Sequence, residues 1–263
     1  MTSATILALM LAWATPGRSI YSQIVVPASS PPACSDRASL LCAEPRPNPA
    51  WDGQHTRPET REEGLARYGQ IARLIHEVAD ASTWTPASAP GCEPPRVQRW
   101  QKASARCDEQ HRARPWAGTS DDLVRYLLTV TAHESGWRAD VHSGRGAHAR
   151  GDRGQSTCLG QIMRTRRGWT SQRGYSWGSL TGLDDAATRR CLETVADYLG
   201  AARAVCVSDY SPMGATGPGC ILACFGGVRS ASNKRIQERV QTFVRFGHAP
   251  KPLPADVVAL ARP

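Results

Sequence analysis

A helical pattern over residues 119–134 constrains the fold most, and it leads into a glycine-rich segment that reaches Met163. Thr119 or Ser120 can cap this helix, and two aspartates follow in the first turn, where the helix dipole favours negative charge. Its apolar side chains recur at helical spacing and form one face: Leu123, Tyr126, Leu127 and Val130. The pattern predicts an amphipathic helix that packs against a core.

The helix ends in the sequence His133-Glu134-Ser135-Gly136-Trp137. A carboxylate beside a tryptophan at the end of an apolar helix can be partly desolvated, which raises its pKa. A glutamic acid that keeps its proton near neutral pH is what cleavage of a glycosidic bond needs as general acid. A single Glu near a helix end is more often simply solvated, so this motif alone leaves both interpretations open. His133 points about 100° away from Glu134 around the helix, and we do not expect it to share the proton.

Two motifs resemble the lysozyme-like lytic transglycosylase family, which includes the soluble lytic transglycosylases and goose-type lysozymes. The first motif is Glu134-Ser135, and the second is Gly151-Asp152-x-Gly154-x-Ser156-x-Cys158-Leu159-x-Gln161-Ile162. The resemblance implies that Glu134 is the catalytic acid and that Ser135 supports it. It also implies that Ser156 and Gln161 line a sugar-binding cleft.

The resemblance covers roughly residues 119–246. A third family segment, Ala-Tyr-Asn-x-Gly, has its nearest match in Ala223-Cys224-Phe225-Gly226-Gly227. Cysteine and phenylalanine stand there at the family's Tyr and Asn positions, so this motif is degenerate. Phe225 and Tyr198, the latter in a Tyr-Leu pair similar to one in the family, are the other residues that the resemblance places in substrate binding.

The resemblance implies a mainly α, lysozyme-like fold with a short β-hairpin or loop at the cleft, stapled by disulfides. It also implies cleavage of the β-1,4 bond between MurNAc and GlcNAc in peptidoglycan, with 1,6-anhydromuramyl products. Asp152 is the candidate second carboxylate of a hydrolytic alternative in which water is the acceptor. An Asp in a Gly-Asp-x-Gly setting is more often a turn-former. A third alternative is a protein of degenerate lysozyme fold that binds the cell wall without cleaving it.

The amino-terminal region predicts a candidate signal peptide over residues 1–14. The apolar run Ala4–Ala14 ends in Ala12-Trp13-Ala14, which has the A-x-A form of a signal-peptidase site. The preceding residues contain neither Lys nor Arg, so an ordinary buried amino terminus is the alternative. With the cysteine content, this pattern predicts a secreted or periplasmic protein.

The nine cysteines are typical of a disulfide-containing protein in an oxidising compartment. Cys34–Cys42 and Cys92–Cys107 are natural local pairs, and two more pairs can come from Cys191, Cys206, Cys220 and Cys224. The odd count leaves one thiol, which we expect at Cys158. We expect no metal and no cofactor, since no tight CxxC pair occurs.

Composition divides the rest of the chain. A Pro-rich linker or arm is predicted over 15–58, a helical extension with a Pro-rich loop over 59–118, the lysozyme-like catalytic domain over 119–250 and a tail over 251–263. A further helix is expected to begin within 159–165. No run of apolar residues is long enough for a transmembrane helix, and the domain is expected to be a monomer.

The chain carries a formal net charge of +9, which suits an anionic partner such as cell-wall polymer. The window 138–173 holds eight arginines against two aspartates, with no Lys or Glu. This window is either a solvated loop or a basic rim that meets an anionic substrate. Peptidoglycan is therefore the expected partner and nucleic acid is not expected, although a basic nucleic-acid or membrane-surface module is the third class that charge alone allows.

Overall fold

The computed structural model describes residues 1–14, 49–51, 56–58, 61–82, 116–145, 151, 154–164, 173–206, 217–228 and 232–250. Within these ranges the protein is mainly helical, as predicted. The helices are α1 (Ser3–Ala14), α2 (Arg61–Ser82), α4 (Ser120–Glu134), α5 (Ala139–Ser143), η5 (Trp177–Leu180), α6 (Asp185–Cys206), α7 (Pro218–Phe225) and α8 (Lys234–Arg245). Two short antiparallel hairpins complete the described structure.

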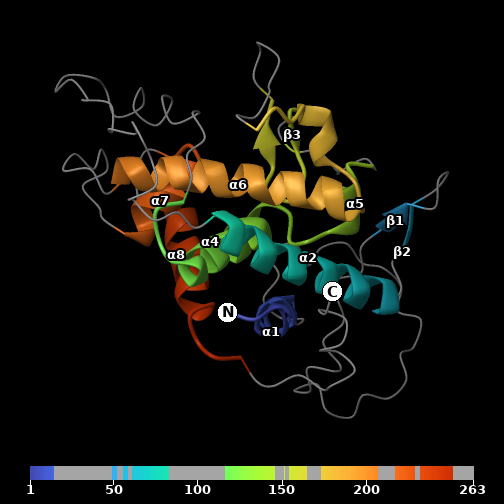
Figure 1. The fold of residues 1–263 in the computed structure, drawn as a ribbon, viewed down its shortest axis with the longest axis horizontal. Coiled ribbons are helices and arrows are strands. Elements are labelled where there is room, and N and C mark those ends of the chain that lie inside the picture. Colours follow the sequence, from blue (N-terminus) through green and yellow to red (C-terminus); the bar gives the residue numbers. More distant parts are fainter. Residues whose placement is uncertain are drawn as a thin grey trace.

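Figure 1 shows how these helices stack. The long helix α6 crosses the molecule, with α7 beside one part of it and η5 beside another. Helices α2 and α4 pack on α6 and on each other, while α1 packs against α2 and α4. Helix α8 contacts both α4 and α7, so it joins the end of the bundle that holds the third motif to the helix that carries Glu134.

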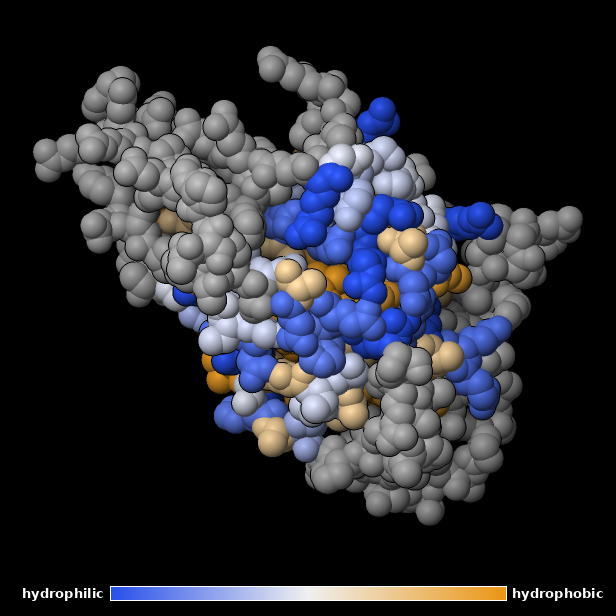
Figure 2. All heavy atoms as spheres, viewed as in Figure 1, coloured by the Kyte–Doolittle hydropathy of each residue, from blue (hydrophilic) through white to orange (hydrophobic). Residues whose placement is uncertain are grey.

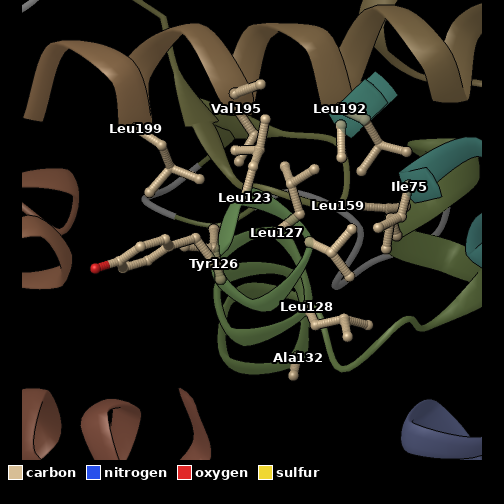
Figure 3. Close-up of a cluster of buried hydrophobic side chains, with 14 of the residues drawn as sticks. Ile75, Leu123, Tyr126, Leu127, Leu128, Ala132, Leu159, Leu192, Val195 and Leu199 are labelled. Atoms are coloured by element: carbon tan, nitrogen blue, oxygen red, sulfur yellow. The ribbon is translucent and has the colours of Figure 1, made fainter. Parts of the chain in front are cut away.

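Helix α4 begins and ends as its sequence predicts. The side-chain oxygen of Thr119 accepts a hydrogen bond from the Asp122 backbone N–H at 3.1 Å, which caps the first turn. The last helical residue is Glu134. The apolar face contacts α6 and α2, where Figure 3 shows Leu192 and Val195 opposite Leu123 and Leu127.

The core is one cluster that runs through both the expected extension and the expected catalytic domain. Tyr68, Ile71 and Ile75 of α2 are buried in the same cluster as the apolar face of α4. Truncation of a side chain such as Leu127 in a core of this kind costs about 2–5 kcal/mol. Helix α2 is therefore an integral part of the packing on which α4 rests.

Helix α1 is also part of this core. Residues 6–11 are all buried, which leaves no polar face in the middle of the helix. A helix that is apolar on all sides is stable only when it is surrounded by other elements. The segment that the sequence predicted as a signal peptide is thus, in this structure, a buried helix beside α2.

One hairpin follows the glycine-rich segment. Strands β3 (Ser156–Thr157) and β4 (Ile162–Met163) pair with Ser156 opposite Met163 and Thr157 opposite Ile162. The hairpin confirms the short β-structure that was expected, but β4 replaces the helix predicted to begin within 159–165. Gly160 lies so close to Val195 of α6 that an added Cβ would come within 2.2 Å of its side chain, so contact with α6 fixes the tip of the hairpin.

The second hairpin pairs β1 (Pro49–Trp51) with β2 (Thr56–Pro58). It lies within the segment predicted as a Pro-rich arm, near α5. Among the described residues no helix is both long and apolar enough to cross a membrane. Hydrophilic side chains cover much of the described surface in Figure 2, with hydrophobic side chains visible between them.

Two disulfides connect the described helices. Cys158 bonds to Cys191, which ties the hairpin to α6, and Cys206 bonds to Cys220, which ties α6 to α7. The prediction that Cys158 keeps its thiol is therefore wrong, because the hairpin folds back onto α6 and brings Cys158 against Cys191. Cys224 is the buried cysteine that retains a thiol in the described part of the chain. The predicted pairs Cys34–Cys42 and Cys92–Cys107 lie outside the described residues.

Candidate functional site

Glu134 lies at the carboxyl end of α4 and pairs with Arg239 of α8. The Arg239 Nη1 atom is 2.7 Å from Glu134 Oε1, and the two side chains are 14% and 21% exposed. Nη1 is buried and makes no hydrogen bond within the described structure, so the contact is a close ion pair without aligned N–H donation. A positive charge this close favours the ionised carboxylate. The site thus holds a partly shielded Glu whose immediate counter-ion is an arginine.

A tight turn after Glu134 fixes its position. The Ser135 hydroxyl donates to the Thr131 carbonyl at 2.8 Å and accepts from the Trp137 N–H at 3.2 Å. Gly136 and Trp137 both have a left-handed backbone, with φ of 58° and 54°. A left-handed tryptophan is uncommon and persists only where its surroundings impose it. Ser135 therefore holds the helix end in place, and both bonds of its hydroxyl lie within the turn.

Aromatic packing imposes that turn. The fully buried Trp137 donates from Nε1 to the Thr131 hydroxyl at 2.8 Å. Its ring meets Trp13 of α1 edge-to-face at 5.2 Å between centroids, and Tyr68 of α2 at 5.8 Å. Trp13 also lies 6.2 Å from the His133 ring. Helices α1 and α2 thus support the residues on both sides of Glu134 in the sequence.

Helix α8 reaches this site through two side chains. His133 Nε2 is 2.8 Å from the Thr242 hydroxyl, and Arg239 lies almost one turn earlier on α8. Asn233 caps the helix by accepting from the Arg235 N–H at 2.9 Å. Arg239 could not be found from the sequence, because periodicity shows which residues share a helix face and not which distant carboxylate one of them meets.

The degenerate third motif also lies beside Arg239. It occupies the last turn of α7, which ends at Phe225. A Cβ atom added at Gly226 would come 3.4 Å from Arg239 Nη1, the same atom that contacts Glu134. The first and third predicted motifs therefore lie beside the same guanidinium nitrogen.

Both polar atoms of the Gln161 side-chain amide form hydrogen bonds within the hairpin and the loop before it. Its Oε1 accepts from the Gly151 N–H at 2.8 Å, and its Nε2 donates to the Cys158 carbonyl at 3.2 Å. Gly151 has no room for a side chain here, since a Cβ would lie 2.4 Å from Gln161 Oε1. The conformation is constrained, with φ of 48° at Gln161 and 60° at Cys158. Gln161 thus stabilises the loop that follows Gly151.

The other predicted site residues are dispersed. Ser156 is buried in β3, while Tyr198 and Phe225 are partly buried and pack against the core. Asp152, the candidate second carboxylate, lies outside the described residues. The structure therefore brings Glu134, Ser135 and the third motif close together. The hypothesis that Asp152 is a second carboxylate stays a prediction.

Two arginines of the basic window have acidic partners. Arg138 pairs with the buried Asp140 at 2.5 Å, and Arg173 donates to both Asp197 oxygens at 2.8 Å. Burial raises the Asp197 pKa in spite of Arg173, while the same pairing raises the pKa of Arg173. Both observations hold because burial is costly to a carboxylate whereas the bidentate bond favours the charged guanidinium. These two arginines serve the fold.

A buried histidine follows the candidate site on α5. His142 lies with Nε2 2.5 Å from the Thr188 hydroxyl of α6, and burial together with the charge of Arg67 lowers its pKa to about 3. A neutral imidazole of this kind is a packed core group. It links α5, which follows the Glu134 turn, to α6.

Comparisons with protein-family models, curated proteins and solved structures find no match for this chain. The class that the structure defines is a mainly helical, disulfide-containing domain with a Glu–Arg pair at the end of a buried helix.

Proposed function

We propose that this protein is a peptidoglycan lytic transglycosylase with a lysozyme-like fold, in which Glu134 acts as acid and then as base. One observation carries the proposal. Glu134 at the end of α4 contacts the Arg239 side chain, and Gly226 of the third motif, just after α7, lies beside the same guanidinium, although the two motifs are far apart in sequence. This convergence is what the family resemblance requires of a shared site, and nothing in the helical pattern of either segment would produce it by itself.

The proposed chemistry needs a single carboxyl group. Glu134 donates a proton to the glycosidic oxygen, the bond to C1 of the muramyl residue breaks, and GlcNAc leaves with a free hydroxyl. The carboxylate then takes the proton of the muramyl C6 hydroxyl, whose oxygen bonds to C1. The product is a 1,6-anhydromuramyl end, and Glu134 regains its proton. Water is not consumed, so the two products together have the mass of the substrate.

Arg239 sets a condition on this chemistry. The ion pair favours the charged carboxylate, whereas the first step needs the protonated one. Substrate must therefore weaken the Arg239–Glu134 contact, for instance by offering an oxygen acceptor to the guanidinium. Because Arg239 Nη1 is buried beside Gly226, this step requires the Arg239 side chain or the end of α7 to move when substrate binds.

The same ion pair favours one alternative. A Glu that is mostly shielded and held by a counter-ion can be purely structural, and the fold would then bind wall polymer without cleaving it. A hydrolase that uses Asp152 is the remaining enzymatic alternative. Under the leading proposal the protein acts outside the cytoplasm, and the two disulfides in the described structure are compatible with that location.

Digestion of purified peptidoglycan by the oxidised protein tests all three. Mass spectrometry should find anhydromuramyl ends in the wild type and none with Glu134→Gln. The matched control is Glu62→Gln, the same change at an exposed position of α2, and it should leave product formation intact. Reducing ends with a gain of water would replace the proposal with a hydrolase. Cosedimentation with the wall and no products would replace it with the binding protein.

A further inference from the structure

Three sulfur atoms meet where α6 and α7 join. Cys206 ends α6, while Cys220 and Cys224 lie one turn apart on α7. Their Sγ atoms all lie within 4.8 Å of one another, and all three residues are buried. Cys206 and Cys220 form a disulfide, and Cys224 retains a thiol. A disulfide needs only two sulfurs, so the third sulfur, on Cys224, has a potential reaction partner within 4.8 Å.

We propose that this cluster is an intramolecular thiol–disulfide exchange site, in which the partner of Cys206 alternates between Cys220 and Cys224. The Cys224 thiol loses its proton and the thiolate attacks Cys206 Sγ. The Cys206–Cys220 bond breaks, a Cys206–Cys224 bond forms, and Cys220 leaves as a thiolate that takes up a proton. One disulfide and one thiol are present before and after, so no oxidant or reductant is consumed.

The geometry favours Cys206 as the sulfur under attack. A bond between Cys220 and Cys224 would lie within one helix and would release α6 from α7. A disulfide between Cys206 and Cys224 still cross-links the two helices. The cross-linked position on α7 changes from the first turn to the last turn. The alternative use of three sulfurs, a metal site, is less suitable while two of them are bonded to each other, because a metal needs thiolates.

The exchange would act on the neighbourhood of Arg239. Cys224 is two residues from Gly226, which borders the Arg239 guanidinium. A disulfide at Cys224 would therefore constrain the last turn of α7, where the third motif lies, and a disulfide at Cys220 constrains the first turn. This coupling to Glu134 rests on the proposed function, whereas the exchange itself does not.

The test locates the thiol in the wild-type protein. Samples of native, oxidised protein are held at several pH values, unfolded in acid with excess N-ethylmaleimide, and digested with chymotrypsin. Cleavage after Tyr210, Leu222 and Phe225 puts the three cysteines on separate peptides. The label should fall on Cys224 at first and then on Cys220 as well, with a rate that rises about tenfold per pH unit while the thiolate is scarce. Label on Cys224 alone at every pH overturns the proposal.

Two controls exclude other sources of label. In Cys224→Ser the cluster has no thiol, so neither Cys206 nor Cys220 should be labelled, and label there would trace the signal to incomplete oxidation and overturn the proposal. Cys158 and Cys191 form the second described disulfide and lie outside the three-sulfur cluster. They should stay unlabelled in every sample, because general scrambling would label them too. Peptidoglycan digestion is not needed for any of these outcomes, so failure of the proposed enzyme would leave them unchanged.

Discussion

Arg239 of α8 holds its Nη1 atom 2.7 Å from Oε1 of Glu134, at the end of α4. The pair joins two helices that are remote in sequence, and the end of α7 borders the same guanidinium. Its charge stabilises an ionised Glu134, while a general acid must be protonated when it acts. The balance between these demands makes Arg239 the most informative residue to change.

Replacement of Arg239 by Gln should separate the structural effect from the chemical one. Loss of the counter-ion leaves a partly shielded carboxylate, which we expect to lower the free energy of unfolding by about 1–2 kcal/mol. Without the positive charge the carboxyl group keeps its proton more readily, so any glycan-cleaving activity should extend to higher pH. Denaturant unfolding and a pH–rate profile measure the two effects.

Arg235→Gln is the matched control for this change, because Arg235 is exposed on the first turn of the same helix. It should alter neither the free energy of unfolding nor the pH–rate profile. An Arg239→Gln protein with an unchanged pH profile would show that the ion pair does not set the protonation state of the catalytic group.

Much of the fold could be predicted from sequence because it depends on local patterns. The cap at Thr119, the apolar face of α4 and its end at Glu134 all follow from residues within one helix. The disulfide of Cys158 could not be found this way, since it depends on how the hairpin folds back to Cys191. Arg239 was missed for the same reason: an ion pair between two helices is a property of their packing.

The strand Ile162–Met163 was mistaken for the start of a helix for a related reason. The segment Leu159-Gly160-Gln161-Ile162 has the apolar spacing of a first helical turn. The left-handed backbone at Cys158 and Gln161 prevents this, and it is imposed by contacts with Gly151 and by the bond to α6. A short apolar run is ambiguous until its tertiary partners are known.

The disulfide between Cys158 and Cys191 should contribute more to the free energy of unfolding than the other described disulfide. It spans 33 residues, against 14 for Cys206–Cys220. On the chain-entropy argument the longer closed loop restricts the unfolded chain more, and replacement of both cysteines by Ser should cost about 3–4 kcal/mol, against about 3 kcal/mol for the shorter loop. Urea unfolding of the two double-serine variants under non-reducing conditions measures the difference.

Thiol labelling of the unfolded, unreduced wild type provides the check on that pairing. Neither Cys158 nor Cys191 should react. Modification of Cys158 in a fully oxidised sample would contradict the pairing and would show that Cys158 keeps its thiol, as the sequence analysis predicted.

His142 should make the fold sensitive to mild acid. Its pKa in the folded protein is lowered to about 3 from the ordinary 6.5, first by burial and then by Arg67. Between these values the unfolded chain binds a proton that the folded chain does not, so stability falls as the pH decreases from about 6.5 towards 3, with a slope of at most about 1.4 kcal/mol per pH unit from this group. Above pH 6.5 the contribution is fully present.

His142→Gln tests this assignment, because the amide can still hydrogen-bond the Thr188 hydroxyl but does not titrate. The free energy of unfolding of the variant should depend less steeply on pH between 6 and 4 than that of the wild type. His76→Gln on α2 is the comparison, since His76 is partly exposed. Equal slopes for His142→Gln and the wild type would assign the acid sensitivity to other groups.

Trp13 connects α1 to the segment that carries Glu134. The ring is buried against His133, which precedes Glu134, and against Trp137, which ends the turn after it. Trp13→Ala would empty this space, and we expect a loss of about 3 kcal/mol in the free energy of unfolding, since Trp-to-Ala changes in a core cost about 3–5 kcal/mol. Ala12→Ser, at an exposed position of the same helix, should be nearly neutral. The measurement is denaturant unfolding of the protein purified from its producing cells, together with the intact mass of the same sample. A mass that lacks residues 1–14, with no stability difference between the two variants, would show that the working protein folds without α1 and that the surfaces of Trp137 and His133 are open beside Glu134.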